Sequence, residues 1–363
     1  MFVAWRELRF ARGRFVLMGT VVALITLLVG FLAGLTGGLA SQNVSAVLEL
    51  PGDRLVLQQP VSGDSSFATS TLDPGTVRAW QQADGVEAAT PVGIAQARAS
   101  SASSGDPRGV ALFGMPAAAP GTAQSSLFAL APSRDGEVGL SAGAADELHA
   151  QRGDTITVAG NDFTVASIGG DLWYSHTPVV AMTPQAWSAA SQSVGGTGEA
   201  TVLAVTGSPD WDDVAEQTST EARNPLASLT ALEAFTSEIG SLGLMIVMLF
   251  GISALVVGAF FTVWTMQRAG DIAVLKALGA TTGSLVRDAL GQALVVLLAG
   301  IGVGLLAVLG LGAVAEQALP FIVSPLTTLA PALVMAALGL AGAAFALRSV
   351  TRADPLTALG SNR

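Results

Sequence analysis

The stretch "DIAVLKALGATTGSLVRDALGQ", residues 271–292, lies between two long apolar runs of the chain. Its apolar side chains recur every third position and so share one face of a helix: Ile272, Leu275 and Leu278. Between them stands Lys276, the only lysine of the protein. Gly279 follows as a suitable C-cap, and a second helix is expected to begin at Thr282. The stretch therefore predicts a short amphipathic helix at a membrane surface, joined directly to a membrane helix.

The composition is that of a membrane protein. Hydrophobic residues make up 51% of the 363 positions and charged residues only 12%, against about 25% charged in soluble domains. Four runs reach the roughly 20 residues that a bilayer-spanning helix needs, and we place the spans at 15–40, 237–266, 285–315 and 327–348. The absence of cysteine excludes disulfides and thiolate metal sites, and the net charge of −10 argues against a nucleic-acid partner.

The basic residues predict the orientation. Most of the 17 lysines and arginines lie at the N-terminus, around Lys276 or at the C-terminus, which fall on one side of a four-span chain. Positive segments remain in the cytoplasm, so both termini are predicted to be cytoplasmic in a multi-pass protein of the plasma membrane. The predicted parts outside the spans are a cytoplasmic interfacial helix, a large extracellular domain, a cytoplasmic coupling segment, a short extracellular loop and a cytoplasmic tail: 1–14, 41–236, 267–284, 316–326 and 349–363.

Two alternatives apply to the N-terminus. The arginines at 1–14 also suit an ordinary charged flank of the first span. A signal peptide over residues 1–40 is the other alternative, because arginines precede an apolar run. The length of that run disfavours it, since the apolar core of a signal peptide has about 7–15 residues.

The extracellular part has the pattern of an α+β domain of two lobes. The segment "SAVLELPGDRLVLQQ" predicts two strands around a Pro-Gly-Asp turn, and a helix is predicted from Asp73 to about Gln82. A helix followed by a hairpin, with its tip at 160–162, is predicted farther on. Serine- and alanine-rich patches at 97–107 and 187–198 are expected to be loops.

No catalytic constellation stands out in this domain. The two histidines, His149 and His176, are far apart and lack the spacing of a zinc-protease motif. We expect His149 to be a solvated helix residue. Asp212 and Asp213 are expected in the first turn of a helix rather than as an acid/base pair. The chain is therefore predicted not to be an enzyme.

The sequence "RAGDIAVLKALGAT" resembles the motif that follows the second span in MacB/FtsX-type ABC transporter permeases. The N-terminal "AWRELRFARGRF", the terminal "ADPLTALG" and the outer "LSAGAADELHAQRGDTITVAGNDFTVASIGG" also resemble that superfamily, so the likeness covers nearly the whole chain. One difference is Asp271, where glutamate is commoner. The resemblance implies one span, a large outer domain and three further spans, the arrangement that hydropathy also predicts.

The same resemblance implies that the amphipathic segment is a coupling helix. This helix would bind a separate cytosolic ATPase subunit, of which the transporter contains two copies. The residues that the resemblance assigns to that contact are Asp271, Ile272, Leu275, Lys276 and Leu278. A phosphate-binding P-loop needs a lysine followed by Ser or Thr, whereas the single lysine here is followed by Ala277. ATP and its magnesium are therefore expected on the partner, and the alternative for this helix is that it rests on lipid headgroups.

Members of the superfamily work as homodimers, which the resemblance implies for this chain. Small residues four positions apart in the predicted spans favour close helix packing, namely Gly30/Gly34, Gly300/Gly304 and Gly339/Ala343. These pairs suit packing within one chain as well as between two.

The cargo is suggested by polar residues near the outer membrane edge. Glu233 and Glu238 precede the second span, and Met245 and Met248 follow along it. Carboxylate, thioether, phenol and imidazole groups can all ligate heme iron. The segment "LWYSHTPVVAMTPQAW" adds Tyr174 and His176, and it resembles a stretch of the heme-efflux permeases of Gram-positive bacteria, the HrtB-like branch.

Heme is therefore the expected cargo, bound in transit and not as a permanent cofactor, with no metal expected apart from heme iron on Glu233 or Glu238. The simpler reading makes the two glutamates solvated carboxylates in the first turn of a helix. In the same way, Tyr174 and His176 could form only a hydrogen-bonded turn. Alternative functions are export or extraction of lipids, lipoproteins or peptides, and an FtsX-like transducer that activates a cell-wall hydrolase.

Overall fold

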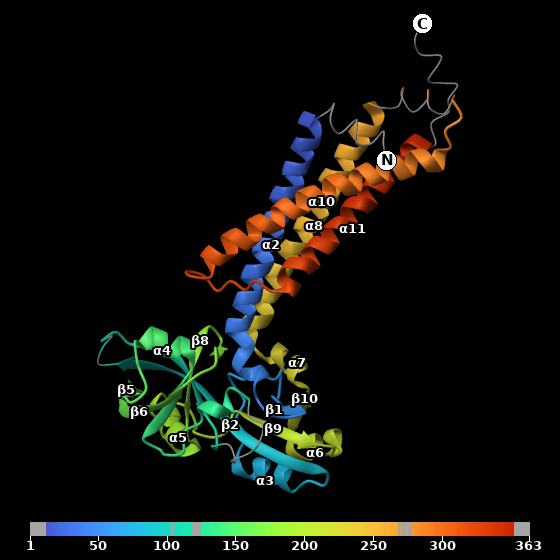
Figure 1. Ribbon diagram of the computed structural model, residues 1–363. Coiled ribbons are helices and arrows are strands. Elements are labelled where there is room, and N and C mark those ends of the chain that lie inside the picture. The colour runs from blue at the N-terminus through green and yellow to red at the C-terminus, as the bar shows by residue number, and fades with distance from the viewer. Residues whose placement is uncertain are drawn as a thin grey trace. The chain divides into compact units, whose positions relative to one another are not determined.

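The computed structural model describes residues 12–101, 103, 105–117, 125–267, 270, 274 and 278–351. The chain forms two compact units, Met1–Gly38 with Gly240–Arg363, and Leu39–Ile239. The first is a helical membrane unit and the second an α+β unit of strands and short helices (Figure 1). The fold class predicted from the sequence is confirmed. Residues 1–11 of the predicted interfacial helix lie outside the described residues. The same is true of residues 352–363 in the predicted C-terminal tail.

Four helices are long and apolar enough to cross a membrane, and each contains one of the predicted spans. They are α2 (Arg12–Leu48), α8 (Glu233–Gln267), α10 (Thr282–Ala315) and α11 (Pro325–Thr351), labelled in Figure 1. The helices extend past the predicted spans, most of all where α2 continues beyond residue 40 and α8 starts before residue 237. The last turns of α2 place Val44, Ala46 and Val47 in the core of the α+β unit. The strand predicted from residue 45 is therefore wrong, since this segment is the end of α2.

Glycines bring α10 against α2 within the membrane unit. A Cβ atom on Gly300 would lie 2.8 Å from the carbonyl oxygen of Gly19, and one on Gly304 would lie 2.7 Å from that of Ala23. Only glycine permits so close an approach of two helix backbones. The other predicted small residues also have neighbours in the same chain, since Gly30 faces Val308. These close approaches therefore serve helix packing within one chain.

The core of the membrane unit lies where the four helices meet. Its fully covered side chains include Val22, Phe261, Leu297 and Met335, one from each helix. Helix α8 is the least covered of the four, with 17% of its most apolar window buried, against 28–33% in the other three. Its outward side chains are apolar, which suits contact with lipid or another apolar surface.

The described residues of the α+β unit form ten strands. Their bounds are β1 (Arg54–Gln58), β2 (Val86–Ser101), β3 (Arg108–Gly114), β4 (Glu137–Leu140), β5 (Thr155–Val158), β6 (Asn161–Ile168), β7 (Trp173–Tyr174), β8 (Thr177–Met182), β9 (Val202–Gly207) and β10 (Thr220–Arg223). The pairing order is β10-β1-β9-β2-β3-β8-β4-β6-β5, and β5 pairs back onto β2. Six strands therefore close into a ring, in the order β2, β3, β8, β4, β6 and β5. From β2, strands β9, β1 and β10 extend as an open sheet.

Short helices and two 3₁₀ turns cover these strands. They are α3 (Pro74–Gln82), η1 (Phe128–Leu130), α4 (Ala142–Leu148), α5 (Pro184–Ser193), α6 (Trp211–Thr218), α7 (Pro225–Ser228) and η2 (Leu229–Ala231). The helix predicted after Asp73 is confirmed, and the Asp73 carboxylate accepts hydrogen bonds from the first turn of α3. Asp212 and Asp213 lie in the first turn of α6, as predicted. His149 caps the C-terminus of α4 in a left-handed conformation instead of lying inside the helix.

The long strand β2 belongs to both lobes. Its first half, from Val86 to Val92, pairs with β9, and its second half pairs with β3 and β5. The expected loops at 97–107 and 187–198 are therefore partly wrong, because β2 runs to Ser101 and α5 runs to Ser193. Small polar residues in these segments are held by pairing and packing, which composition does not reveal. The β5–β6 hairpin also turns at Ala159 and Gly160, one residue earlier than predicted.

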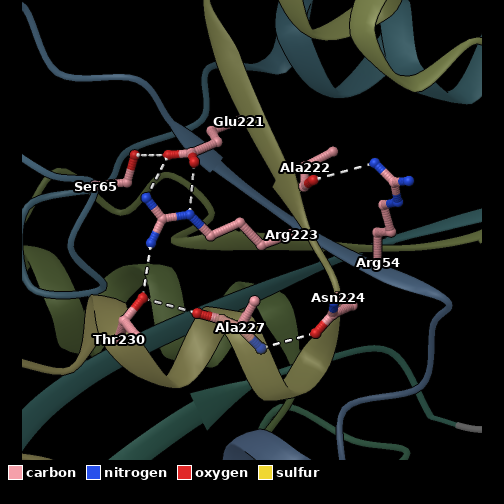
Figure 2. A network of polar contacts seen from close by, with 8 residues as sticks. All are labelled: Arg54, Ser65, Glu221, Ala222, Arg223, Asn224, Ala227 and Thr230. Atoms are coloured by element: carbon pink, nitrogen blue, oxygen red, sulfur yellow. Dashed lines mark hydrogen bonds and ion pairs between the residues drawn. The ribbon is translucent and has the colours of Figure 1, made fainter. Parts of the chain in front are cut away.

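A polar network fastens β10 to the chain that leads into α8 (Figure 2). The guanidinium of Arg223 donates two hydrogen bonds to the carboxylate of Glu221, at 2.6 and 2.8 Å, and one to the Thr230 hydroxyl at 3.0 Å. The Ser65 hydroxyl donates to the same carboxylate at 2.7 Å. Asn224 accepts a hydrogen bond from Ala227 N–H and so caps α7. The network ties the edge strand to the helical turns that precede α8.

Candidate functional site

The turn between β7 and β8 contains two residues, Ser175 and His176, because Tyr174 pairs with Thr177. Both have positive φ angles, 45° and 63°. A two-residue turn with two left-handed positions favours Asn and Gly, so Ser and His hold this conformation at some cost in backbone energy. The Thr177 hydroxyl donates to the carbonyl of Tyr174 at 2.7 Å and closes the turn.

The end of α2 holds this turn in place. Ser175 N–H donates to the carbonyl of Asn43 at 3.1 Å, and His176 N–H donates to the carbonyl of Gln42 at 3.0 Å. The Ser45 hydroxyl accepts a hydrogen bond from Trp173 N–H at 2.9 Å. These carbonyls belong to the last turns of a helix and lie near its end. The backbone around His176 is therefore fixed by α2, which compensates for the strained turn.

The side chain of His176 meets the carboxylate of Glu238 from the start of α8. Its Nε2 lies 2.8 Å from Oε1 and 3.0 Å from Oε2. Asn43 completes the group, with Nδ2 at 3.3 Å from His176 Nε2 and 3.3 Å from Glu238 Oε2. The imidazole and the carboxylate keep 31% and 36% of their surface exposed. Three elements far apart in sequence thus converge on one accessible polar group, the His176 cluster (Asn43, His176 and Glu238).

Asn43 is the fully buried member of the cluster. None of its surface is exposed, and its Oδ1 has no hydrogen-bond partner among the residues that the structure describes. A buried polar atom without a partner costs free energy and requires a physical reason. Sequence analysis did not identify Asn43. Its only signal was an amide side chain shortly after a long apolar run.

Tyr174 does not lie with His176, although the two were grouped as candidates. Its ring is buried in the core and makes edge-to-face contacts with Phe67 and Phe113, at centroid distances of 6.4 and 5.8 Å. Burial raises the pKa of the phenol far above its usual range, so the phenolate form needed for iron ligation is disfavoured. The ring serves the core under the turn.

The remaining cargo candidates lie on α8. Glu233 is its first residue and is exposed to solvent. Met245 and Met248 belong to the membrane unit and are exposed by 47% and 59%, so both thioethers are accessible at its surface. Within the described part of the chain, no group of three or more His, Cys, Asp or Glu side chains is arranged to hold a metal ion.

Most of the predicted coupling residues lie outside the described residues, namely Asp271, Ile272, Leu275 and Lys276. Leu278 is described, and its side chain is 79% exposed. Its N–H donates to the carbonyl of Val274 at 3.0 Å, a helical spacing. Gly279 has a φ of 95°, as a C-capping glycine requires, and α10 begins at Thr282 as predicted.

Residues 243–355 match the FtsX-like permease C-terminal family. This range begins inside α8 and includes α10 and α11, so it covers the last three spans. These three spans therefore form an FtsX-like permease domain. As a whole, the chain resembles ABC transporter permeases.

Its relatives extend the likeness to the full length. The chain is 25% identical over 365 residues to a putative hemin transport system permease protein HrtB of Staphylococcus haemolyticus, covering 99% of each chain. It is 26% identical to an uncharacterized ABC transporter permease of Mycobacterium tuberculosis, again over 99% of each. The periplasmic region of MacB from Actinobacillus actinomycetemcomitans aligns with 53% of this chain and 97% of that one, at 11% identity and a TM-score of 0.33.

Proposed function

We propose that the protein is the membrane subunit of an efflux transporter that moves heme from the bilayer to the outside. The observation that carries this proposal is the full-length likeness to the staphylococcal permease, whose name assigns it hemin transport. A likeness over 99% of both chains includes the α+β unit as well as the spans, so it does not rest on the common FtsX-like part alone.

The described side chains include suitable ligands for heme iron. In the α+β unit, His176 offers an imidazole and Glu238 a carboxylate, both partly exposed. Glu233 adds a second, exposed carboxylate at the start of α8. In the membrane unit, Met245 and Met248 present thioethers beside apolar side chains, which suits a flat amphipathic molecule. Transport requires release, so we expect transient ligation by one or two of these groups.

The energy comes from a separate cytosolic ATPase in this proposal. The exposed Leu278 and the segment before it form the coupling helix, whose apolar face binds a groove on that partner. Two permease chains and two ATPase subunits would make the complete transporter, with the weakly covered α8 available for contact with the second permease chain. Closure of the ATPase pair would move the spans through the coupling helix.

A hemin titration of the purified chain tests the cargo. We expect the hemin Soret band to shift on binding. In Glu233→Ala/Glu238→Ala the shift should be lost, or the affinity for hemin should fall at least about tenfold, because both carboxylates near the start of α8 are removed. The matched control is Glu87→Ala/Glu216→Ala, which removes two exposed carboxylates elsewhere on the α+β unit. No Soret shift with wild type, or equal shifts in both double variants, would refute the site.

Co-purification with the ATPase provides the second arm of this test. Leu275→Asp should abolish capture of the ATPase, because a charge on the apolar face of the coupling helix opposes its burial in a groove. Leu226→Asp, at an exposed position of α7, is the control that should leave capture unchanged. Undiminished capture by Leu275→Asp would overturn the coupling role.

A further inference from the structure

We propose that a groove between α2 and α10 binds one anionic phospholipid. One acyl chain of the lipid lies along the groove, and the headgroup lies near the N-terminal ends of the two helices. This lipid is a resident ligand of the membrane unit and not the transported cargo. The proposal therefore goes beyond the proposed function and does not rest on it.

The groove lies beside the close contact of the two helices and has a volume of about 580 Å³. Small lining residues leave this space open, namely Gly19, Ala23, Ala299 and Ala307. Larger apolar side chains border it and are between 44% and 65% exposed, namely Val16, Leu24, Val295 and Val303. Exposed apolar side chains around a concave surface are typical of a binding groove for an apolar ligand.

The chemistry of the lining favours a hydrocarbon chain over heme. Among the described residues that line the groove, only Thr20 has a polar side chain. Its other side chains are aliphatic or, at Phe15, aromatic. Heme iron is held by imidazole, thiolate, thioether or phenolate groups, and none of these belongs to the described lining residues. An acyl chain needs no such ligand.

The dimensions also favour a single acyl chain. On α2 the groove extends from Phe15 to Leu27, which is roughly 18 Å of helix and close to the ~15 Å of one leaflet of the hydrocarbon core. The volume then corresponds to a cross-section of about 30 Å². An extended hydrocarbon chain is about 4–5 Å wide, whereas a helix with side chains is about 10–12 Å wide. The groove is therefore too narrow for a helix of a second permease chain.

Positive charge at one end of the groove suits an anionic headgroup. Gly300 approaches Gly19 and Gly304 approaches Ala23, so α2 and α10 run in the same direction and their N-terminal ends lie together. Residues 1–14, which precede the groove on α2, contain four arginines and one glutamate. On α10, the exposed Arg287 precedes the groove.

The predicted orientation places this end of the groove on the cytoplasmic side, where the leaflet carries anionic lipids. Each arginine near such a surface strengthens the binding of an anionic headgroup about fivefold. An anionic lipid should therefore bind in preference to a zwitterionic lipid with the same acyl chains.

Native mass spectrometry of the full chain in mild detergent tests the headgroup. The probes are phosphatidylglycerol and phosphatidylcholine with identical acyl chains, added in equal amounts. We expect one phosphatidylglycerol per chain, a preference of at least about fivefold over phosphatidylcholine, and a higher unfolding temperature when it is bound. Arg14→Gln/Arg287→Gln should reduce the preference to about twofold or less. The matched control is Arg108→Gln/Arg152→Gln, which removes two exposed arginines of the α+β unit and should keep the preference.

A second variant tests the position of the acyl chain. Ala299 is exposed in the groove, so Ala299→Phe fills the groove without entering the helix core. Retention of both lipids should fall at least about tenfold, because exclusion of two methylene groups already has that effect. Ala313→Phe, at an exposed position of α10 outside the lining, is the control and should bind as wild type does.

Equal retention of the two lipids by wild type, or unchanged lipid binding in Ala299→Phe, would overturn the proposal. Loss of a permease dimer in Ala299→Phe would assign the groove to a second chain instead. Displacement of bound phosphatidylglycerol by hemin would assign it to the cargo. A hemin titration without a Soret shift, together with selective phosphatidylglycerol binding, would support this site and reject only the proposed cargo.

Discussion

Glu221 is held between a cation and a hydroxyl at the edge of the α+β unit. The hydrogen bonds from Arg223, and after them that from Ser65, lower the pKa of this carboxyl, while partial burial opposes the shift. A carboxylate whose pKa is lower in the folded state stabilises the fold when it is ionised. Its side chain is 39% exposed, so solvent screening keeps this contribution to about 1 kcal/mol or less.

The lowered pKa fixes the sign of an acid dependence. The contribution of Glu221 is fully present above its unfolded pKa, near the reference value of 4.5, and is lost as the pH falls through the lower folded pKa. Glu221→Gln should therefore lower the unfolding temperature more at pH 7 than at about pH 3, because the contribution of the ionised carboxylate shrinks as the pH falls below its unfolded pKa. Thermal unfolding of both proteins at the two pH values measures this. Glu87→Gln, at an exposed position, is the control, and an equal loss at both pH values would contradict the expectation.

Candidate residues could be predicted from sequence where the chemistry of a single side chain identified them. Their arrangement could not, because it depends on the local turn of the backbone. His176 and Glu238 were both identified as candidates, but their meeting depends on pairing between distant segments. Tyr174 was grouped with His176 because both lie in the segment that resembles the heme-efflux permeases. The left-handed backbone at Ser175 and His176 directs the two side chains differently, and the ring of Tyr174 lies in the core.

Within helix α10, glycines divide into two kinds. Gly300 and Gly304 face α2 with no room for a side chain, whereas a Cβ atom on Gly302 or Gly310 would meet no neighbouring group within 4 Å. Glycine inside a helix weakens it by roughly 0.5–1 kcal/mol relative to alanine. At Gly300 and Gly304 this cost is offset by the close packing of two helices.

This division predicts opposite outcomes for one type of substitution. Gly304→Leu should separate α10 from α2 and destabilise the membrane unit by about 1–3 kcal/mol, as overpacking usually does. Gly302→Leu should leave stability unchanged or raise it slightly, because leucine is the better helix former. Unfolding temperature and monodispersity in detergent measure the difference. Similar behaviour of the two variants would contradict the packing of α2 against α10.

The four spans could be predicted because uninterrupted apolar runs have few alternatives in a bilayer. The ends of the helices could not be predicted, because an apolar segment has the same sequence pattern whether lipid or protein covers it. Val44 and Val47 continue the apolar character of α2, but the core of the α+β unit covers them. The same segment, read alone, has the short alternation of a strand.

For the molecule as a whole, the positions of the basic residues predict the orientation in the membrane. The proposal places the α+β unit outside and the segment around Leu278 in the cytoplasm, where a cytosolic ATPase is able to reach it. A chain without cysteine permits a clean test, because any thiol label reports a single introduced position. Suitable exposed positions are Val61 in the α+β unit, Leu278, and Gln317 between α10 and α11.

Labelling with a membrane-impermeant maleimide should therefore divide three single-cysteine variants into two groups. Val61→Cys and Gln317→Cys should react on intact cells, because both positions are exposed and lie on the extracellular side in this orientation. Leu278→Cys should react only after the membrane is permeabilised, since a reagent that cannot cross the bilayer does not reach the cytoplasmic side. Labelling of Leu278→Cys in intact cells, or protection of Val61→Cys until permeabilisation, would invert the orientation. An inverted chain would present the α+β unit to the ATPase, and coupling through residues 267–284 would then be physically excluded.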